Sequence, residues 1–333
     1  MINIPKTKRG RQTTAQQAER DAEILRLCDL IKRIQSTLEF TVSSRGWCYL
    51  LEEHGLNKGS FDTTQRIIND CRKNGLLPLD ICAEDITRTT EGIQDPDNDN
   101  ITDHAADWID HVKNHVSTTY QPYHFTEYQD CYIEMGLEKI DLKGIFAPVC
   151  DKYHVPYYNM KGWSDINSRA AMMERFKYWE SQGKHCVLLL CGDHDPGGLN
   201  ITNFMRSNLA DLSQAVQWNP GSLIIDRFGL NYDFIQSNNL TKIENLETSS
   251  GGHLDNPKHK DHYKPYVQNY LFSYGAWKVE ANALVTRIEA GRNLCENAIL
   301  KYINVDGFKQ YLTDTAEARQ SLQAEIITQM RQQ

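Results

Sequence analysis

An apolar run ends at two carboxylates in the stretch VLLLCGDHDPGGLNI, which covers residues 187–201. Consecutive branched apolar residues predict a buried β-strand that ends near Cys191. In an extended chain residues i and i+2 point to the same side, so we expect the side chains of Asp193 and Asp195 to converge. Carboxylate oxygens are the ligands that Mg²⁺ prefers, so the stretch predicts a metal site at a strand end. The alternative is a polar turn without a metal.

The residues around the carboxylates indicate how the chain leaves the strand. Pro196 cannot continue a central strand, and Gly197 and Gly198 allow a tight turn. The pattern that follows predicts a helix over residues 199–212. His194 points away from the two aspartates, so we expect it to pack or to support the site rather than to bind the metal.

Strand and helix patterns alternate ahead of this stretch, which predicts a parallel sheet flanked by helices. The order is a strand at 132–137, a helix at 142–153, a strand at 155–159 and a helix at 166–182. Ligand sites in such sheets lie beyond the carboxyl ends of the strands. Glu138 follows the first strand, so we expect it to join Asp193 and Asp195 as a metal ligand. Glu134 could replace it in a shifted register.

The composition is that of an ordinary water-soluble protein, with 333 residues, 40% hydrophobic and 24% charged. No segment is apolar enough for a membrane span or a secretory signal, so we expect a cytoplasmic protein, nucleoid-associated in a prokaryote, without a membrane partner. Nine cysteines without a Cys-x-x-Cys pair predict reduced packing residues rather than disulfides or a zinc site.

The net charge of −8 is unevenly distributed. Residues 76–135 hold 13 Asp/Glu against 2 Lys/Arg, and they outweigh a basic N-terminal part. The acidic run at 91–110 lacks the glycine and the distal glutamate of a calcium loop, so it predicts a linker leading into a helix at 103–116. Global charge therefore does not exclude a DNA partner, which depends on the local surface.

The N-terminal part predicts a small DNA-binding module. An amphipathic helix at 13–39 follows a basic arm, and a helix at 43–53 ends at Gly55. Ser60 is the predicted cap of a second helix that runs to residue 73, and a short strand is predicted at 79–83. Two short helices and a strand are typical of a winged-helix module, which presents its second helix to a DNA groove; a small helical domain is the alternative. The candidate DNA contacts are Lys58, Arg66, Arg72 and Lys73.

Several motifs, taken in order, resemble those of the topoisomerase VI A subunit and of its relative, the meiotic double-strand-break protein. SRGWCYLL at 44–51 resembles the family's Arg-x-x-Tyr-Tyr helix, with Tyr49 at the nucleophile, and CRKNGLLP at 71–78 is similar to the segment that closes its winged helix. Glu138 and the Asp-x-Asp pair resemble the carboxylates of the family's Toprim domain. RFGL at 227–230 and VEANAL at 279–284 resemble later sequence signatures of that domain. The similarity spans residues 40–300 and is greatest to the short stand-alone homologues called Mini-A.

The resemblance implies an α/β fold with an N-terminal CAP-like winged-helix domain followed by a Toprim domain. The implied boundaries are a basic arm and helix at 1–40, the winged helix at 41–118, and the Toprim domain with a C-terminal extension at 119–333. It also implies a homodimer, in which the tyrosine and the carboxylates of each site come from different subunits. A complete topoisomerase cycle would need a separate ATPase B-type subunit.

The implied chemistry is Mg²⁺-dependent cleavage of double-stranded DNA, in which Mn²⁺ can substitute. Tyr49 attacks a phosphodiester and becomes linked to a 5′ end, and Arg45, one turn earlier, contacts the phosphate or the phenolate. Cys48 departs from the family, because it replaces the first aromatic of the Tyr-Tyr pair. Two other functions stay open: a Toprim nuclease that uses water, and an inactive DNA-binding or scaffold protein.

Overall fold

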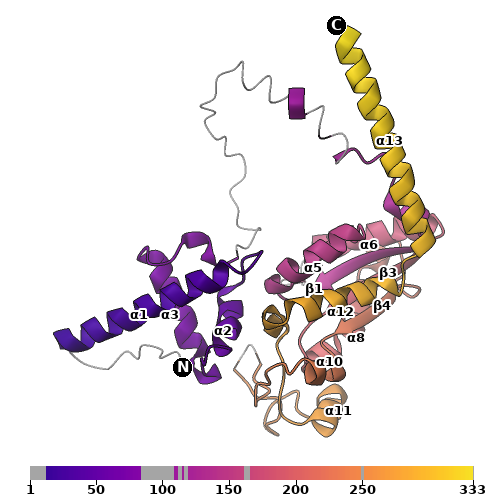
Figure 1. Ribbon diagram of the computed structural model, residues 1–333. Helices are drawn as coiled ribbons and strands as arrows, with labels where there is room; N and C mark the ends of the chain where they lie inside the picture. Colours follow the sequence, from indigo (N-terminus) through magenta and orange to yellow (C-terminus); the bar gives the residue numbers. More distant parts are fainter. Residues whose placement is uncertain are drawn as a thin grey trace.

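A four-stranded parallel sheet forms the centre of the protein (Figure 1). The computed structural model describes residues 13–83, 109–111, 115, 119–160, 166–248 and 251–332. The strands run in the order β2-β1-β3-β4. They are β1 (Cys131–Leu137), β2 (Tyr157–Asn159), β3 (His185–Cys191) and β4 (Ile224–Gly229). The predicted α/β class and the parallel pairing are therefore confirmed, and β4 is an additional strand.

Both faces of the sheet are covered by helices, which explains why β3 is apolar and buried from Cys186 to Cys191. Met135 and Leu189 face α5 (Ile140–Lys152) and α12 (Ile288–Leu300). Leu188, on the opposite face, belongs to a second core. That core is completed by α6 (Ile166–Ser181), α8 (Ile201–Ala210) and α9 (Ser213–Val216).

Further helices pack around these two layers or against one another. They are η4 (Phe125–Tyr128), α7 (Pro196–Leu199), α10 (Tyr232–Ser237), α11 (Pro265–Tyr274), η5 (Ala281–Thr286) and α13 (Val305–Gln332). The helix predicted at 199–212 is thus divided into α7 and α8 at Asn200. Figure 1 shows α13, in yellow, projecting away from the body.

The N-terminal part is helical. It consists of α1 (Thr14–Gln35), α2 (Ser44–Glu52), η1 (Lys58–Ser60), α3 (Phe61–Lys73) and η2 (Leu79–Ile81). Ser43 caps α2 through a hydrogen bond from the Gly46 amide to its side chain. Ser60 does not cap α3, contrary to our prediction, because it already continues the helical turn of η1.

The strand predicted at 79–83 is wrong. Residues 79–81 form η2 instead, and Cys82 makes a single bridge to Val42. The carbonyl of Ile81 accepts a 2.8 Å hydrogen bond from the Trp47 indole, so a side chain takes the position of a strand partner. The two helices predicted for the module at 41–118 are present as α2 and α3, and the winged-helix module itself stays a prediction.

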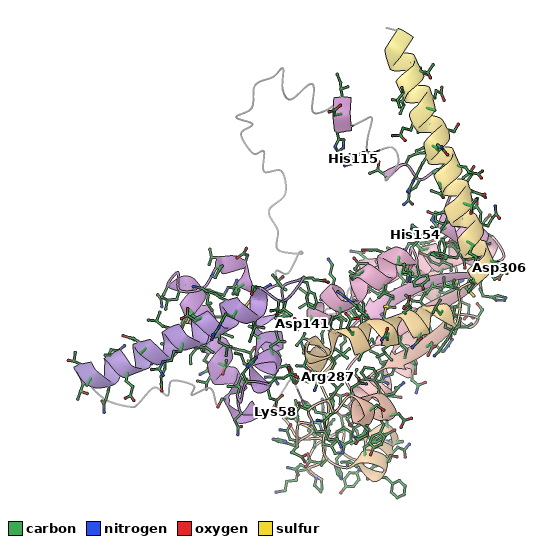
Figure 2. The ribbon with its side chains drawn as sticks, in the orientation of Figure 1. Lys58, His115, Asp141, His154, Arg287 and Asp306 are labelled. Carbon is green, nitrogen blue, oxygen red and sulfur yellow. The ribbon has the colours of Figure 1, made fainter. Side chains whose placement is uncertain are left out.

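One buried carboxylate joins the N-terminal helices to the body. Asp141, at the start of α5, accepts hydrogen bonds from the backbone and side chain of Ser43 and from the amide of Asn282 in η5. A Cβ at Gly46 would lie 3.0 Å from the Asp141 carboxylate, so a larger residue would displace it. In Figure 2, Asp141 and Arg287 lie along this boundary. The contact sets the position of α2 against η5.

Two expectations from composition can be compared with the structure, and a third lies mostly outside the described residues. All nine cysteines are free, and all but Cys131 are buried, as predicted. Within the described residues, none of the helices is both long and apolar enough to cross a membrane. The acidic linker and most of the helix predicted at 103–116 lie outside the described residues.

Candidate active site

The carboxyl ends of β1 and β3 lie side by side, because Leu137 pairs with Cys191. This register brings together the predicted ligands Glu138 and Asp193. A carboxylate oxygen of Glu138 accepts a 2.8 Å hydrogen bond from the Asp193 amide. The ammonium of Lys139 lies 3.1 Å from the Glu138 carboxylate and 2.9 Å from that of Asp193. A cation thus already lies between two of the three predicted ligands.

Asp195 lies close to this pair but is turned toward α7. Its carboxylate accepts a 2.6 Å hydrogen bond from the Gly198 amide and so caps that short helix. A Cβ at Gly198 would lie 2.0 Å from the Asp193 carbonyl, which confirms that the turn needs a glycine. Arg227 holds the same turn, because its guanidinium donates to the Gly198 carbonyl at 2.7 Å and to the Asp193 carbonyl at 3.0 Å.

The electrostatics of these groups are suited to a hard cation. Burial raises the pKa of Asp193 to about 7, and Glu138 adds to the shift while Lys139 opposes it. Burial also raises the pKa of Asp195. Burial opposes the charge on Lys139, but Asp193 and Glu138 outweigh it and raise its pKa. The donors are carboxylate oxygens, which is the ligand chemistry of Mg²⁺ or Mn²⁺.

Metal binding at this site requires side chains to move. In the part of the chain that the structure describes, no three His, Cys, Asp or Glu side chains are grouped closely enough to hold a metal ion. Lys139 separates Glu138 from Asp193, and Asp195 is engaged by α7. Departure of the Lys139 ammonium and rotation of the Asp195 carboxylate would complete an oxygen site.

Tyr49 lies beside this acidic edge in the same chain. Tyr49 is 1% exposed, and its hydroxyl donates a 2.9 Å hydrogen bond to the Glu280 carboxylate. Its ring packs edge to face on Phe61 of α3. Burial, followed by the charge of Glu280, raises the pKa of Tyr49 well above its ordinary value. The phenol is therefore protonated and covered.

Glu280 connects the tyrosine to the carboxylate edge. The Arg45 guanidinium donates to both oxygens of Glu280, at 3.0 and 3.1 Å. The amide of Ala281, the next residue, donates a 2.8 Å hydrogen bond to Asp193. Burial opposes the charge on Glu280, but the Arg45 guanidinium and the Tyr49 hydroxyl outweigh it and lower its pKa. Glu280 is therefore an ionised proton acceptor in contact with the predicted nucleophile.

Four of the five residues proposed for chemistry thus lie together, and Asp195 adjoins them. The resemblance implied that tyrosine and carboxylates come from different subunits, whereas the structure brings Tyr49 and Asp193 to one site within a single chain. Sequence reasoning missed the role of Glu280 and the position of Lys139. The sequence signal for Glu280 is an acidic residue directly after the apolar Val279. In the structure Val279 pairs with His194, in the turn that follows β3, and this pairing places Glu280 beside the carboxylates.

Two other candidates have structural roles. Glu134 is fully buried within β1 and makes a bidentate ion pair with Arg175, at 2.7 and 2.9 Å. It also accepts a hydrogen bond from the Tyr132 hydroxyl, so it is not available to replace Glu138. His194 points away from the carboxylates and stacks on Trp277, as the packing interpretation predicts.

The four basic residues proposed for DNA contact do not form one surface. Lys58, the first residue of η1, donates to the backbone carbonyl of Lys242 in the body. Arg66 is exposed on α3. Arg72 and Lys73 lie at the end of α3 and line a hollow together with Lys32 of α1.

Neither family models nor curated proteins provide a relative for this chain. No family model matches it, and no curated protein sequence matches it. The geometry of the described residues is therefore the basis for any functional conclusion.

Proposed function

We propose that this protein is a DNA-cleaving transesterase of the type IIB topoisomerase A-subunit kind. The observation that supports it best is the hydrogen bond between Tyr49 and Glu280, one residue from the segment that binds Asp193. A nucleophile, a proton acceptor and a carboxylate edge suited to a divalent cation are thus neighbours. Activated nucleophiles in enzymes have this arrangement.

In the proposed reaction the Tyr49 oxygen forms a bond to a DNA phosphorus and the bond from phosphorus to the 3′ oxygen breaks. Glu280 accepts the phenolic proton, and the departing 3′ oxygen takes a proton from water. The products are a phosphotyrosyl link to a 5′ end and a free 3′ hydroxyl. Because the phosphodiester energy is kept in the new bond, the reverse attack reseals the strand.

Arg45 and the carboxylate edge act on the phosphate. Arg45 pairs with Glu280 here, and its planar guanidinium is suited to bidentate contact with a phosphate. Mg²⁺ held by Glu138 and Asp193, with Asp195, would offset charge on the phosphate and on the leaving oxygen. Until a metal ion binds, the Lys139 ammonium balances the negative charge of Glu138 and Asp193.

The covered phenol means that cleavage needs a rearrangement. DNA reaches Tyr49 only when α2 moves away from η5, because the tyrosine is almost completely buried between them. We infer that the arrangement described here is the resting one, and that a homodimer on duplex DNA re-forms the contact around a phosphate. An ATPase partner would be needed for strand passage.

The test is to trap the covalent complex. Purified protein is incubated with Mg²⁺ or Mn²⁺ and a duplex labelled at one 3′ end, then denatured with detergent. We expect labelled DNA on the wild-type protein and none on Tyr49→Phe. Tyr128→Phe is the matched control, because its hydroxyl also donates to a carboxylate, that of Asp314, at 2.8 Å.

The same experiment separates the alternatives. If Tyr49→Phe cuts as well as wild type while Asp193→Ala does not, water is the nucleophile and the protein is a metal-dependent nuclease. If the wild type neither cuts nor forms an adduct with either metal on linear or supercoiled DNA, the scaffold function is the correct one.

A further inference from the structure

Two backbone pairings place Lys278 beside the predicted metal ligands. Val279 and His194 exchange hydrogen bonds of 2.8 and 3.1 Å, and Lys278 and Ile243 exchange hydrogen bonds of 2.8 and 3.0 Å. The extended segment that holds Lys278 and Val279 therefore lies between the turn that follows β3 and the chain around Ile243.

The antiparallel register assigns the side chains of this segment to two faces. In such a pairing, directly opposite residues share a face, and successive residues along each chain alternate between the faces. The residues on either side of the pair formed by His194 and Val279 are therefore opposite each other and lie on one face: Asp195 with Lys278, and Asp193 with Glu280. Lys278 thus belongs to the face that carries the carboxylates.

Side-chain contacts agree with this assignment. On the other face His194 stacks on Trp277, with 5.3 Å between the ring centroids, and the Lys242 ammonium lies 4.2 Å from the centre of the same tryptophan ring. On the face of the carboxylates, burial raises the pKa of Asp195, and the positive charge of Lys278 is among the influences that oppose this rise. Lys242 and Lys278 are close in the fold but point to opposite sides.

The charge of Lys278 is held differently from the other cations of the site. Its ammonium donates a 2.7 Å hydrogen bond to the Glu247 carbonyl, a neutral group, and it makes no ion pair within the described part of the chain. Lys139, by contrast, lies between two carboxylates, and Arg45 is paired with Glu280. An ammonium has three N–H donors, and hydrogen bonds from a charged donor to phosphate oxygens are strong. The half-buried Lys278 is therefore suited to an anion that approaches the carboxylate face.

Lys278 also lies at a short, defined distance from the proposed nucleophile. Glu280 accepts the Tyr49 hydroxyl, and it follows Lys278 by two residues of extended chain, which span about 7 Å. Arg45 already lies at the position of the phosphate that Tyr49 attacks. Successive phosphates of one DNA strand are separated by a comparable distance, so the adjacent phosphate is the one that Lys278 can reach.

We propose that Lys278 binds the DNA phosphate next to the one that Tyr49 attacks, and that its ammonium is transferred from the Glu247 carbonyl to a phosphate oxygen. The proposal rests on the proposed function. It gives a role to a residue to which sequence reasoning assigned none, and the contact holds the strand against the carboxylates without a proton transfer. The alternative is a structural lysine that only fastens the chain at Glu247.

The first test measures binding without cleavage. The full chain carrying Tyr49→Phe is titrated in EDTA against a fluorescent duplex of about 30 base pairs, and the dissociation constant is measured by anisotropy between about 50 and 200 mM KCl. Loss of one phosphate contact in Lys278→Met should reduce the slope of log affinity against log salt by about 0.9 and weaken binding roughly 8-fold at about 100 mM. Lys242→Met, on the other face, is the matched control and should change neither. Lys278→Arg keeps the charge and should keep the slope.

The second test locates the contact by ethylation interference. A labelled duplex with a single ethylated phosphate at a random position is incubated with Mg²⁺ and protein that retains Tyr49, and the ethylated positions in the trapped adducts are compared with those in the total DNA. Ethylation of the phosphate beside the cut should be excluded from adducts of the wild type and of Lys242→Met. In Lys278→Met this exclusion should weaken.

The outcomes separate the inference from the proposed function. An unchanged salt slope or an unchanged interference pattern in Lys278→Met overturns the inference, and the adducts at Tyr49 leave the proposed function standing. A lower melting temperature together with the wild-type slope assigns Lys278 the structural role. If the wild type forms no adduct under any condition, the proposed function fails and the role of Lys278 fails with it.

Discussion

The Tyr49 hydroxyl donates a 2.9 Å hydrogen bond to the carboxylate of Glu280, which lies 231 residues further along the same chain. The Glu280 carboxylate is also paired with the Arg45 guanidinium, so the guanidinium, the carboxylate and the phenol form one hydrogen-bonded unit. Such a unit restricts the tyrosine in two ways. The phenol remains protonated, and it remains covered until the unit opens.

Removal of the phenolic hydroxyl should weaken the fold measurably. A hydrogen bond to a charged group contributes about 1–3 kcal/mol, so Tyr49→Phe should lower the free energy of unfolding by about that amount in urea titrations. In a double-mutant cycle with Glu280→Gln the two effects should couple by roughly 1 kcal/mol. Additive effects would show that the hydrogen bond does not form in solution.

Asp141 should contribute more to the free energy of unfolding than an exposed acidic residue of the same helix, α5. Asp141→Ala leaves the side-chain donors of Ser43 and Asn282 without an acceptor, at about 1–3 kcal/mol each, so we expect a loss of about 2–6 kcal/mol in unfolding free energy. Asp151→Ala, at an exposed position further along α5, should change it by less than about 0.5 kcal/mol. Equal effects would contradict the proposed joining role.

The two glycines of the turn that follows β3 should respond differently to alanine. A Cβ at Gly198 meets the Asp193 carbonyl at 2.0 Å, whereas at Gly197 its nearest contact is a carboxylate oxygen of Asp195 at 3.4 Å. We expect Gly198→Ala to lower the melting temperature and to abolish adduct formation, and Gly197→Ala to retain both. Thermal melts and detergent trapping measure the two properties.

Lys139 should compete with divalent cations. In Lys139→Met the facing carboxylates of Glu138 and Asp193 lose their internal cation, so the variant should melt lower in EDTA and gain more from Mg²⁺ than wild type. A tenfold gain in affinity would add about 2–4 °C to the Mg²⁺-induced shift. Lys152→Met, which removes a comparable pair with Glu296, is the control. A smaller Mg²⁺ shift in Lys139→Met than in wild type would refute the competition.

Acid should destabilise the protein partly through His154. Burial, assisted by Arg319, lowers the pKa of this imidazole below its ordinary value of 6.5. Its neutral form is therefore favoured in the folded state, so its stabilising contribution is complete above about pH 6.5 and is lost as the pH falls toward the lowered pKa. His154→Phe should flatten the dependence of melting temperature on pH below 6.5. His54→Gln, at an exposed position, should leave it unchanged. In Figure 2 the labelled His154 lies apart from the labelled Asp141 and Arg287.

The sheet and the edge of the site were predictable because local patterns decide them. A strand buried on both faces is continuously apolar, and a parallel order brings Glu138 beside Asp193 without any knowledge of side-chain contacts. The helices of the N-terminal part follow in the same way from their apolar spacing and, for α2, from the Ser43 cap.

Other features depend on contacts between distant segments, and the sequence does not reveal them. Glu280 reaches Tyr49 because Val279 pairs with His194, which no local pattern predicts. The strand predicted after Pro78 is absent because the Trp47 indole binds the Ile81 carbonyl.

The joining contact at Asp141 has a consequence for assembly. The N-terminal helices and the sheet meet through side chains, and the chain between residues 83 and 119 supplies the covalent connection. A covalent connection fixes the effective concentration of one part around the other. The same surfaces in a second copy are chemically identical, so exchange of the N-terminal helices between chains would keep every contact. Any balance between a closed monomer and an exchanged dimer would therefore depend on protein concentration.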